Sequence, residues 1–192
     1  MEKKDKPKKS GKLKEHIKRS PHTEDLVDHY WGSINYVSDL IKSSELKAGL
    51  ILSFYGILLN FIYQGVEALT HKPSGNTLMY SLIGLWVLCT CISIYYCVRC
   101  FMPKIEGKYT PNVFFFGDVI TRFGDIKQFS KTFFEISLDE YTLFEQLGEQ
   151  IYISSKIAAW KFKNVKRAIY FLAISLVVLL ILAAHYVMVY FF

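Results

Sequence analysis

Two groups of side chains in this sequence have the types and spacing that chemistry requires. Cys97 and Cys100 form a Cys-x-x-Cys pair, which in soluble proteins binds metals or carries out redox reactions. Asp118 and Asp125 flank Arg122, so the three could form a polar site, or the carboxylates could cap the turns and the helix start that nearby glycines indicate. We favour capping. For the thiols we favour packing as small apolar groups, because no second cysteine pair accompanies them.

The sequence offers no further catalytic or metal-binding pattern. Its five histidines are scattered, and none has metal-ligand spacing with cysteines or acids. It contains no phosphate-binding loop, no dinucleotide fingerprint and no Gly-x-Ser-x-Gly nucleophile turn. We therefore predict that the protein is not an enzyme, that it holds no metal and that it needs no cofactor.

Long apolar segments set the class of the protein. Because about 20 helical residues cover the roughly 30 Å hydrocarbon core of a bilayer, residues 48–67, 78–101 and 168–190 are each long enough to span it. Residues 168–192 include no formally charged side chain. We predict an all-α membrane protein with three transmembrane helices and a cytoplasmic helical collar or stalk. For residues 48–67 a buried or re-entrant helix is the alternative.

The distribution of Lys and Arg predicts the orientation of the spans. Residues 1–22 form a basic tail that we expect to be disordered, and nine basic and three acidic residues among the first 20 account for the whole net charge of +6. Lys72 is the only Lys or Arg between the first two spans. The positive-inside bias therefore places the N-terminus and residues 103–167 in the cytoplasm and the C-terminus outside. For the tail we favour anionic lipid over nucleic acid as the partner.

Two amphipathic segments would connect the cytoplasmic part to the spans. Residues 23–47 carry apolar side chains at helical spacing, with Thr23 available as a cap. A second stripe begins at Leu138 and continues without a proline to the third span. We expect the two stripes to pack against each other in a collar whose sensor region is 103–167. Within that region, residues 114–116 could form a strand or a wedge on the membrane surface.

One face of the first span carries small and polar residues. They are spaced three or four residues apart and are Gly49, Ser53, Gly56, Asn60 and Gln64. In a bilayer such a face contacts other helices, because backbones approach closely there and amides find partners. It could pack within the same chain, or it could be a self-association or pore-lining face of a homo-oligomer.

Several motifs, in their order and their placement against three spans, resemble one known family. Ser-Glu-Leu-Lys-Ala at 44–48 opens the first span, and Phe-Phe-Gly-Asp-Val at 115–119 and Asp-Glu-Tyr at 139–141 follow. The most specific stretch runs from Gln-Ile-Tyr at 150–152 through Ser-Lys-Ile-Ala at 155–158 to Lys161. Over about residues 35–175 the sequence is similar to the membrane effectors of bacterial Pycsar antiphage systems, the PycTM family. Glu45 stands where the family pattern more often has Asp.

The resemblance implies a function that composition alone does not give. In such systems a partner uridylate or cytidylate cyclase senses infection and makes cyclic CMP or cyclic UMP. The effector is then expected to bind that messenger and impair the bacterial inner membrane, so that growth stops before phage spread. The lipid bilayer and the cyclic nucleotide are thus the implied partners, and no nucleic acid is expected.

A cyclic nucleotide carries one negative charge and a base, so a cation beside an aromatic ring would suit it. The candidates are Arg122, Tyr152, Lys156, Trp160 and Lys161. Lys156 and Lys161 could instead be basic flanks of the third span. Two other classes compete with the effector. A small ion channel or transporter subunit would conduct without any nucleotide, and a structural membrane protein would be harmless at any nucleotide level.

Overall fold

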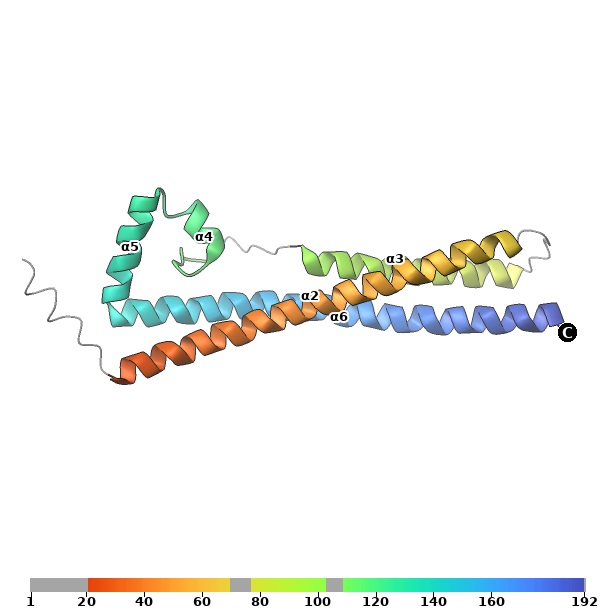
Figure 1. Ribbon diagram of the computed structural model, residues 1–192, viewed down its shortest axis with the longest axis horizontal. Coiled ribbons are helices and arrows are strands. Elements are labelled where there is room, and N and C mark those ends of the chain that lie inside the picture. Colours follow the sequence, from red (N-terminus) through yellow and green to blue (C-terminus); the bar gives the residue numbers. More distant parts are fainter. Residues whose placement is uncertain (1–20, 70–76, 103–108, 192) are drawn as a thin grey trace, which may run out of the picture. The chain divides into compact units, whose positions relative to one another are not determined.

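Most of the described chain is helical. The computed structural model describes residues 21–69, 77–102 and 109–191, and there it contains five helices and no strand (Figure 1). The helices are α2 (Pro21–Leu69), α3 (Thr77–Phe101), α4 (Phe116–Thr121), α5 (Ile126–Leu138) and α6 (Glu140–Phe191). Three of them, α2, α3 and α6, are long and apolar enough to cross a membrane. The prediction of an all-α membrane protein with three transmembrane helices is confirmed.

Two compact units share the long helices. Unit 1 combines the described parts of residues 1–37 and 105–155, and unit 2 combines those of residues 38–104 and 156–192. Because α2 and α6 are each continuous, both contribute to both units. The boundaries predicted at residues 47 and 167, where amphipathic segments give way to spans, therefore fall inside unbroken helices.

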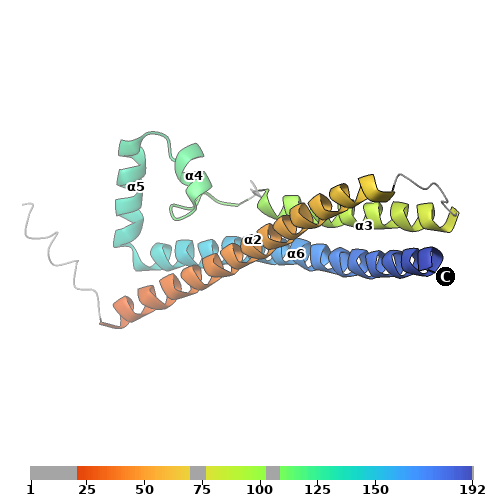
Figure 2. The same cartoon turned by 45° about the vertical axis from the view of Figure 1, so that its right-hand side comes forward.

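The core of unit 2 lies where α2, α3 and α6 run side by side (Figure 1, Figure 2). Its buried residues are Ala48, Ile51, Tyr55, Cys97, Cys100, Val165 and Ala168. Hydroxyl groups form hydrogen bonds between these helices: the hydroxyls of Tyr55 and Ser175 lie 3.1 Å apart, and the Ser93 hydroxyl donates to the Ala168 carbonyl over 2.8 Å. Such bonds matter in a bilayer, because no water is available to satisfy buried polar groups.

Several aromatic rings contact one another in unit 1. Phe114 makes edge-on contacts with Trp31 at 5.8 Å and with Phe133 at 5.7 Å between ring centroids. The rings of Tyr30 on α2 and Phe144 on α6 lie 5.3 Å apart. Each such pair contributes about 0.5–1.5 kcal/mol beyond the burial of its area. The expected packing of the amphipathic stripes of α2 and α6 against each other is therefore present.

The helix starts differ from the prediction at two places. Helix α2 begins at Pro21, whose missing N–H suits a first helical position, so Thr23 lies inside the first turn instead of capping it. The Thr23 hydroxyl donates to the Glu140 carboxylate over 3.1 Å. The stripe expected to start at Leu138 is interrupted, because Asp139 is extended, with φ −99° and ψ 106°. The Asp139 carboxylate accepts a hydrogen bond from the Thr142 hydroxyl at the start of α6.

Residues 114–116 do not form a strand, so that alternative is wrong. They lead into the short helix α4 through a turn in which the Phe115 backbone N–H donates to the Asn112 carbonyl over 3.1 Å. Phe114 is half-buried among aromatic rings, whereas Phe116 is exposed. The three phenylalanines thus divide between packing and surface, which periodicity alone does not predict.

Candidate functional site

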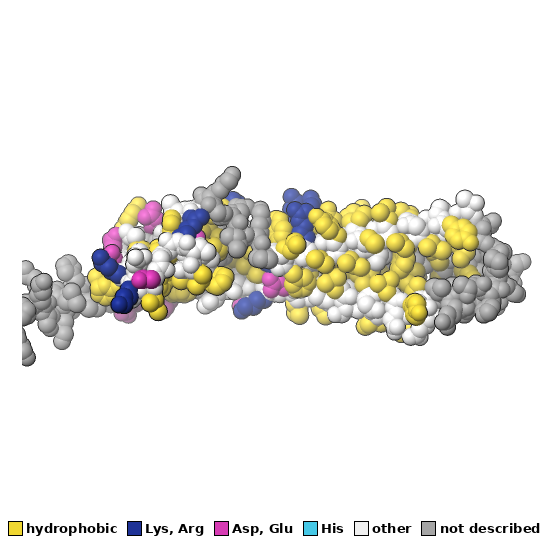
Figure 3. All heavy atoms as spheres, turned by 90° about the horizontal axis from the view of Figure 1, so that it is seen from above, with side chains coloured by type: hydrophobic (Ala, Val, Ile, Leu, Met, Phe, Trp, Pro, Cys, Tyr) yellow, Lys and Arg dark blue, Asp and Glu magenta, His cyan; other side chains and the backbone are white. Residues whose placement is uncertain are grey.

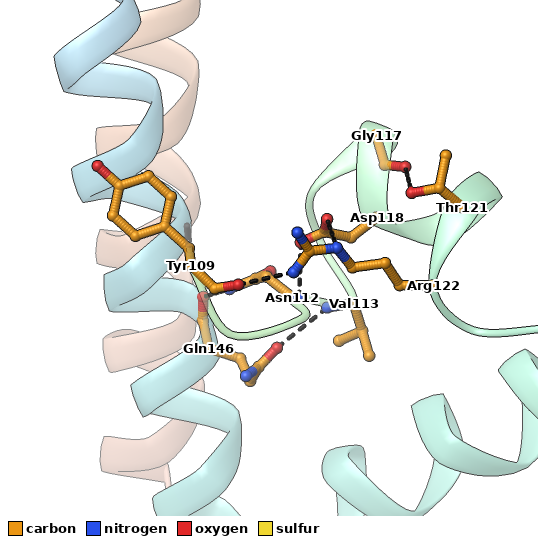
Figure 4. A network of polar contacts seen from close by, with 8 residues as sticks. All are labelled: Tyr109, Asn112, Val113, Gly117, Asp118, Thr121, Arg122 and Gln146. Atoms are coloured by element: carbon orange, nitrogen blue, oxygen red, sulfur yellow. Dashed lines mark hydrogen bonds and ion pairs between the residues drawn. The ribbon is translucent and has the colours of Figure 1, made fainter. Parts of the chain in front are cut away.

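A loop at residues 109–115 is fixed to the first part of α6 by hydrogen bonds (Figure 4). The fully buried Asn112 donates from Nδ2 to the Gln146 carbonyl over 2.7 Å, and its Oδ1 accepts from the Phe114 N–H over 2.9 Å. The Gln146 side chain accepts in turn from the Val113 N–H over 3.0 Å. The donor and the acceptor of the buried Asn112 amide therefore both have partners, and these hydrogen bonds hold the loop in one position.

Asp118 and Arg122 brace the other side of this loop (Figure 4). The Asp118 carboxylate accepts from the Asn112 N–H over 3.0 Å, and its second oxygen lies 3.3 Å from Nε of Arg122. The Arg122 guanidinium donates to the Tyr109 carbonyl over 2.7 Å. Asp118 lies within α4 and caps no helix start, so that part of its predicted capping role is wrong. Its carboxylate does accept a backbone N–H of the loop, and it pairs with Arg122. The polar site predicted from Asp118, Arg122 and Asp125 together is not formed, because it lacks Asp125.

Asp125, by contrast, is the N-cap of α5. Its carboxylate accepts from the backbone N–H of Gln128 over 2.8 Å. The residue before it, Gly124, has a φ of 70°, a left-handed conformation that residues with a Cβ rarely adopt. The capping prediction is confirmed for this carboxylate.

Substituting the two aspartates should loosen different segments. Asp118→Asn removes the charge that pairs with Arg122 and should destabilise the loop by about 1–3 kcal/mol. Asp125→Ala removes a helix cap and should cost about 1 kcal/mol, confined to the first turn of α5. Amide hydrogen exchange would show faster exchange at residues 112–119 in the first variant and at 126–129 in the second. Unchanged exchange at 112–119 in Asp118→Asn would contradict the bracing role.

Tyr152 presents an exposed ring beside the same loop. Its ring centroid lies 6.2 Å from that of Tyr109 with the planes at 81°, and the residue is 59% exposed. Since the Tyr109 carbonyl accepts from Arg122, the structure brings Arg122 and Tyr152 to one loop residue. A guanidinium and an exposed aromatic ring are groups that bind a phosphate and a base.

Lys161 lies in unit 2, where its ammonium group already has two partners. It is only 4% exposed, and Nζ lies 2.7 Å from a carboxylate oxygen of Glu45 and 2.7 Å from the carbonyl oxygen of Cys100. Cys100 belongs to the last turn of α3, where carbonyls lack partners within the helix and the helix dipole favours a cation. One ammonium group therefore joins α2, α3 and α6.

The remaining predicted residues, Lys156 and Trp160, also belong to unit 2. Lys156 is exposed, and Trp160 is half-buried with the Arg99 guanidinium 5.8 Å from its ring centroid. The five predicted nucleotide-binding residues are thus divided between the units, with two in unit 1 and three in unit 2.

The small and polar face of the first span is not covered by the described helices. A Cβ atom placed on Gly56 would meet nothing within 4 Å, and one on Gly49 would meet only the Phe101 ring, at 3.8 Å. The polar members of this face are all exposed: Ser53, Asn60 and Gln64. Helix α2 packs through its other side, which contains Ala48, Ile51 and Tyr55. Packing within the described chain therefore does not account for this face.

Cys97 and Cys100 show the packing that was predicted for them, since both are fully buried in the core of unit 2. Cys89 is also buried, whereas Cys91 is exposed. Within the described ranges, no three His, Cys, Asp or Glu side chains come close enough to share a metal ion.

The sequence analysis missed four residues that form the loop network beside α6 and the ion pair with Lys161. They are Glu45, Tyr109, Asn112 and Gln146. Glu45 had a signal, because it and Lys161 both lie in motifs that carry the family resemblance. Asn112 had only a turn signal, since it follows Pro111 and precedes an aromatic run.

Comparisons with known proteins match one long region of the chain, and this region includes both the loop beside α6 and the Glu45–Lys161 pair. A family model described as the Pycsar effector protein domain, PycTM, matches residues 29–188. The Pycsar effector protein PtPycTM of Propioniciclava tarda is 22% identical over 158 residues, which cover 80% of this chain and 77% of that relative. No solved structure matches the chain. The matched residues contain the loop beside α6 and the Glu45–Lys161 pair.

Proposed function

The chain belongs to the PycTM family of Pycsar effectors, and on this premise we propose that it senses a cyclic pyrimidine nucleotide and then impairs the bacterial inner membrane. The family match over residues 29–188 carries the proposal and supports an effector role in antiphage defence. Three helices able to cross a bilayer support the membrane as its target. The messenger would be cyclic CMP or cyclic UMP from a partner cyclase, and the outcome would be growth arrest and abortive infection.

Messenger binding is assigned first to the surface beside Arg122 and Tyr152. The negative charge of the cyclic phosphate would compete with Asp118 for the guanidinium, and the pyrimidine would stack on the exposed ring. Occupancy would thereby release an ion pair that braces the loop at residues 109–115. Lys156, Trp160 and Lys161 remain candidates for the same assay, although Lys161 would first have to leave Glu45.

Helix α6 provides the route from messenger to membrane. It is continuous from Glu140 to Phe191 and includes both Tyr152 and the third apolar span. A messenger that binds one packing of the loop and helices more tightly shifts the population towards it by the ratio of the two affinities. In this scheme the N-terminus and residues 103–167 lie in the cytoplasm, where a cyclase makes the nucleotide, and the C-terminus lies outside.

Co-expression with a pyrimidine cyclase tests this function. Growth arrest, loss of membrane potential and dye entry should occur only when this protein and an active cyclase are present together. A catalytically dead cyclase and a purine cyclase serve as controls. Unchanged membrane potential under both cyclic CMP and cyclic UMP would sink the proposal, and conduction without any nucleotide would favour a channel instead.

Tyr152→Ala should raise the messenger level needed for growth arrest by about tenfold, because base stacking on one aromatic ring is worth about 1–3 kcal/mol. Titration of cyclase expression against growth rate measures the shift. Tyr36→Ala is the matched control, since Tyr36 is another exposed tyrosine of unit 1 with no ring contact to the loop. Equal sensitivity of the two variants would move the messenger away from Tyr152.

Asn60→Leu should weaken self-association, which we propose occurs through the uncovered face of α2 to form a homo-oligomer. An interhelical amide in a bilayer contributes about 0.6–2 kcal/mol, and a symmetric assembly loses this at each interface. Crosslinking in membranes and messenger-dependent toxicity would both decline, whereas the exposed-site control Ser81→Leu on α3 should change neither. If association and toxicity both survive Asn60→Leu, the face has another role.

A further inference from the structure

Two arginines of unit 2 lie over aromatic rings at the end of α3 and the adjoining part of α6. The Arg99 guanidinium lies 6.0 Å from the Tyr95 ring centroid and donates to the Tyr95 hydroxyl over 3.3 Å. The Arg167 guanidinium lies 5.4 Å from the centroid of Tyr96. The two tyrosine rings contact each other at 5.5 Å. A continuous series of contacts therefore runs from one guanidinium to the other.

These two charges differ from the charge of Lys161 in the same unit. The ammonium group of Lys161 is buried and paired with Glu45. Among the described residues, neither Arg99 nor Arg167 forms an ion pair with a carboxylate. Both are held in place by aromatic rings instead, with their remaining N–H donors available. Two positioned guanidinium groups without a protein anion indicate a site for an anion from outside the chain.

The place of these arginines identifies the kind of anion. Arg167 immediately precedes the charge-free residues 168–192, and Arg99 lies in the last turn of α3. Both therefore lie where a span meets the headgroup layer, together with tyrosine and tryptophan rings that favour that layer. Figure 3 shows Lys and Arg side chains gathered next to a long hydrophobic surface. The spacing of Trp160, Lys163 and Arg167 places a further cation on the same face of α6.

We infer that Arg99 and Arg167 bind the phosphate of an anionic lipid headgroup in the seam between α3 and α6. A planar guanidinium group can bind two oxygens of one phosphate at once. The rings of Tyr95, Tyr96 and Trp160 would hold the two guanidinium groups beside the acyl chains. The inference is independent of messenger binding at Arg122 and Tyr152, because it uses other charged residues and another ligand. Trp160 is the one residue that it shares with the remaining messenger candidates. Its consequence is that the effector prefers membranes rich in anionic lipid.

Native mass spectrometry of the full-length protein in detergent tests the site. Phosphatidylglycerol should be retained in preference to phosphatidylcholine, and Arg99→Gln with Arg167→Gln should reduce that retention about tenfold or more. Lys42→Gln with Lys131→Gln loses the same charge at exposed positions elsewhere and should leave retention unchanged. Arg99→Lys with Arg167→Lys keeps the charge that orients the spans but removes the planar fork, so it should retain less lipid than the native protein.

Three outcomes of the lipid comparison would overturn the inference. They are equal retention of the two lipids by the native protein, undiminished phosphatidylglycerol retention in the double glutamine variant, and equal losses in the Lys42/Lys131 control. Inorganic phosphate forms the last arm. If millimolar phosphate displaces phosphatidylglycerol, the site takes a soluble anion and the assignment to lipid is overturned. Full retention in that arm supports the lipid headgroup.

Discussion

Glu45→Gln should lower the free energy of unfolding of the membrane-spanning unit by about 2–4 kcal/mol. Removing one partner of a buried ion pair typically costs about 3–5 kcal/mol, because the other charge is left without compensation. Here the stranded charge is Lys161, whose side chain is 5% exposed, while the Glu45 side chain is 39% exposed, which reduces the cost. The hydrogen bond from Lys161 to the Cys100 carbonyl remains. A protein of this size should lose roughly 5–10 °C in melting temperature.

Substituting the two partners of this ion pair should cost different amounts of stability. Lys161→Met removes the buried charge and leaves a carboxylate that can turn towards water, so it should cost less than Glu45→Gln. The double variant should be no less stable than Glu45→Gln alone, because no charge is then stranded. Thermal unfolding of the purified protein, followed by size-exclusion fluorescence, measures all three. Strictly additive losses would mean that the two side chains do not depend on each other.

Inserting Gly-Pro between Lys163 and Arg167 should abolish messenger-dependent membrane damage. A proline inside a helix costs about 3 kcal/mol or more and kinks it, and this position lies well within the continuous helix α6. Binding of the cyclic nucleotide to the purified protein should persist, because Arg122 and Tyr152 belong to the other unit. Dye entry at saturating messenger, compared with nucleotide binding by calorimetry, separates the two steps.

A control insertion keeps this result interpretable. The same Gly-Pro inserted between Leu138 and Asp139, where the chain is already extended between α5 and α6, interrupts no long helix and should preserve damage. If damage persists at full strength after the insertion in α6, this helix is a membrane anchor and does not transmit the signal. If nucleotide binding is lost as well, the units depend on each other for folding, and the coupling role proposed for α6 is withdrawn.

Patterns that extend along the chain were predictable from the sequence. The three spans follow from length and hydropathy, and the pairing of α2 with α6 follows from stripes at helical spacing. The face of small and polar residues on α2 was predictable for the same reason, since residues such as Gly56 and Asn60 follow one another at helical spacing. The continuity of α6 into the third span was predictable too, because the stripe from Leu138 runs on without a proline. The unbroken length of α2 was not predicted, because residues 23–47 and 48–67 differ in composition, although such a change does not by itself end a helix.

Contacts between distant residues were not predictable in the same way. Lys161 had the composition of a nucleotide ligand or a basic flank, and only the structure pairs it with Glu45, 116 positions away. Asn112 is a common turn residue by type, yet it is the centre of the loop network because it is buried against Gln146. The Asp139 interruption was missed because its neighbours fit one helical stripe on either side. One capping residue is enough to end one helix and start the next.

Dye release from vesicles tests the central claim most directly. The purified protein would be reconstituted in vesicles of phosphatidylethanolamine and phosphatidylglycerol with a trapped fluorescent dye, and cyclic CMP, cyclic UMP and cyclic AMP would be added separately. We predict release with cyclic CMP or cyclic UMP, none with cyclic AMP and none without nucleotide. Release that is equal with and without nucleotide, or an intact bilayer under saturating cyclic CMP and cyclic UMP alike, would contradict it.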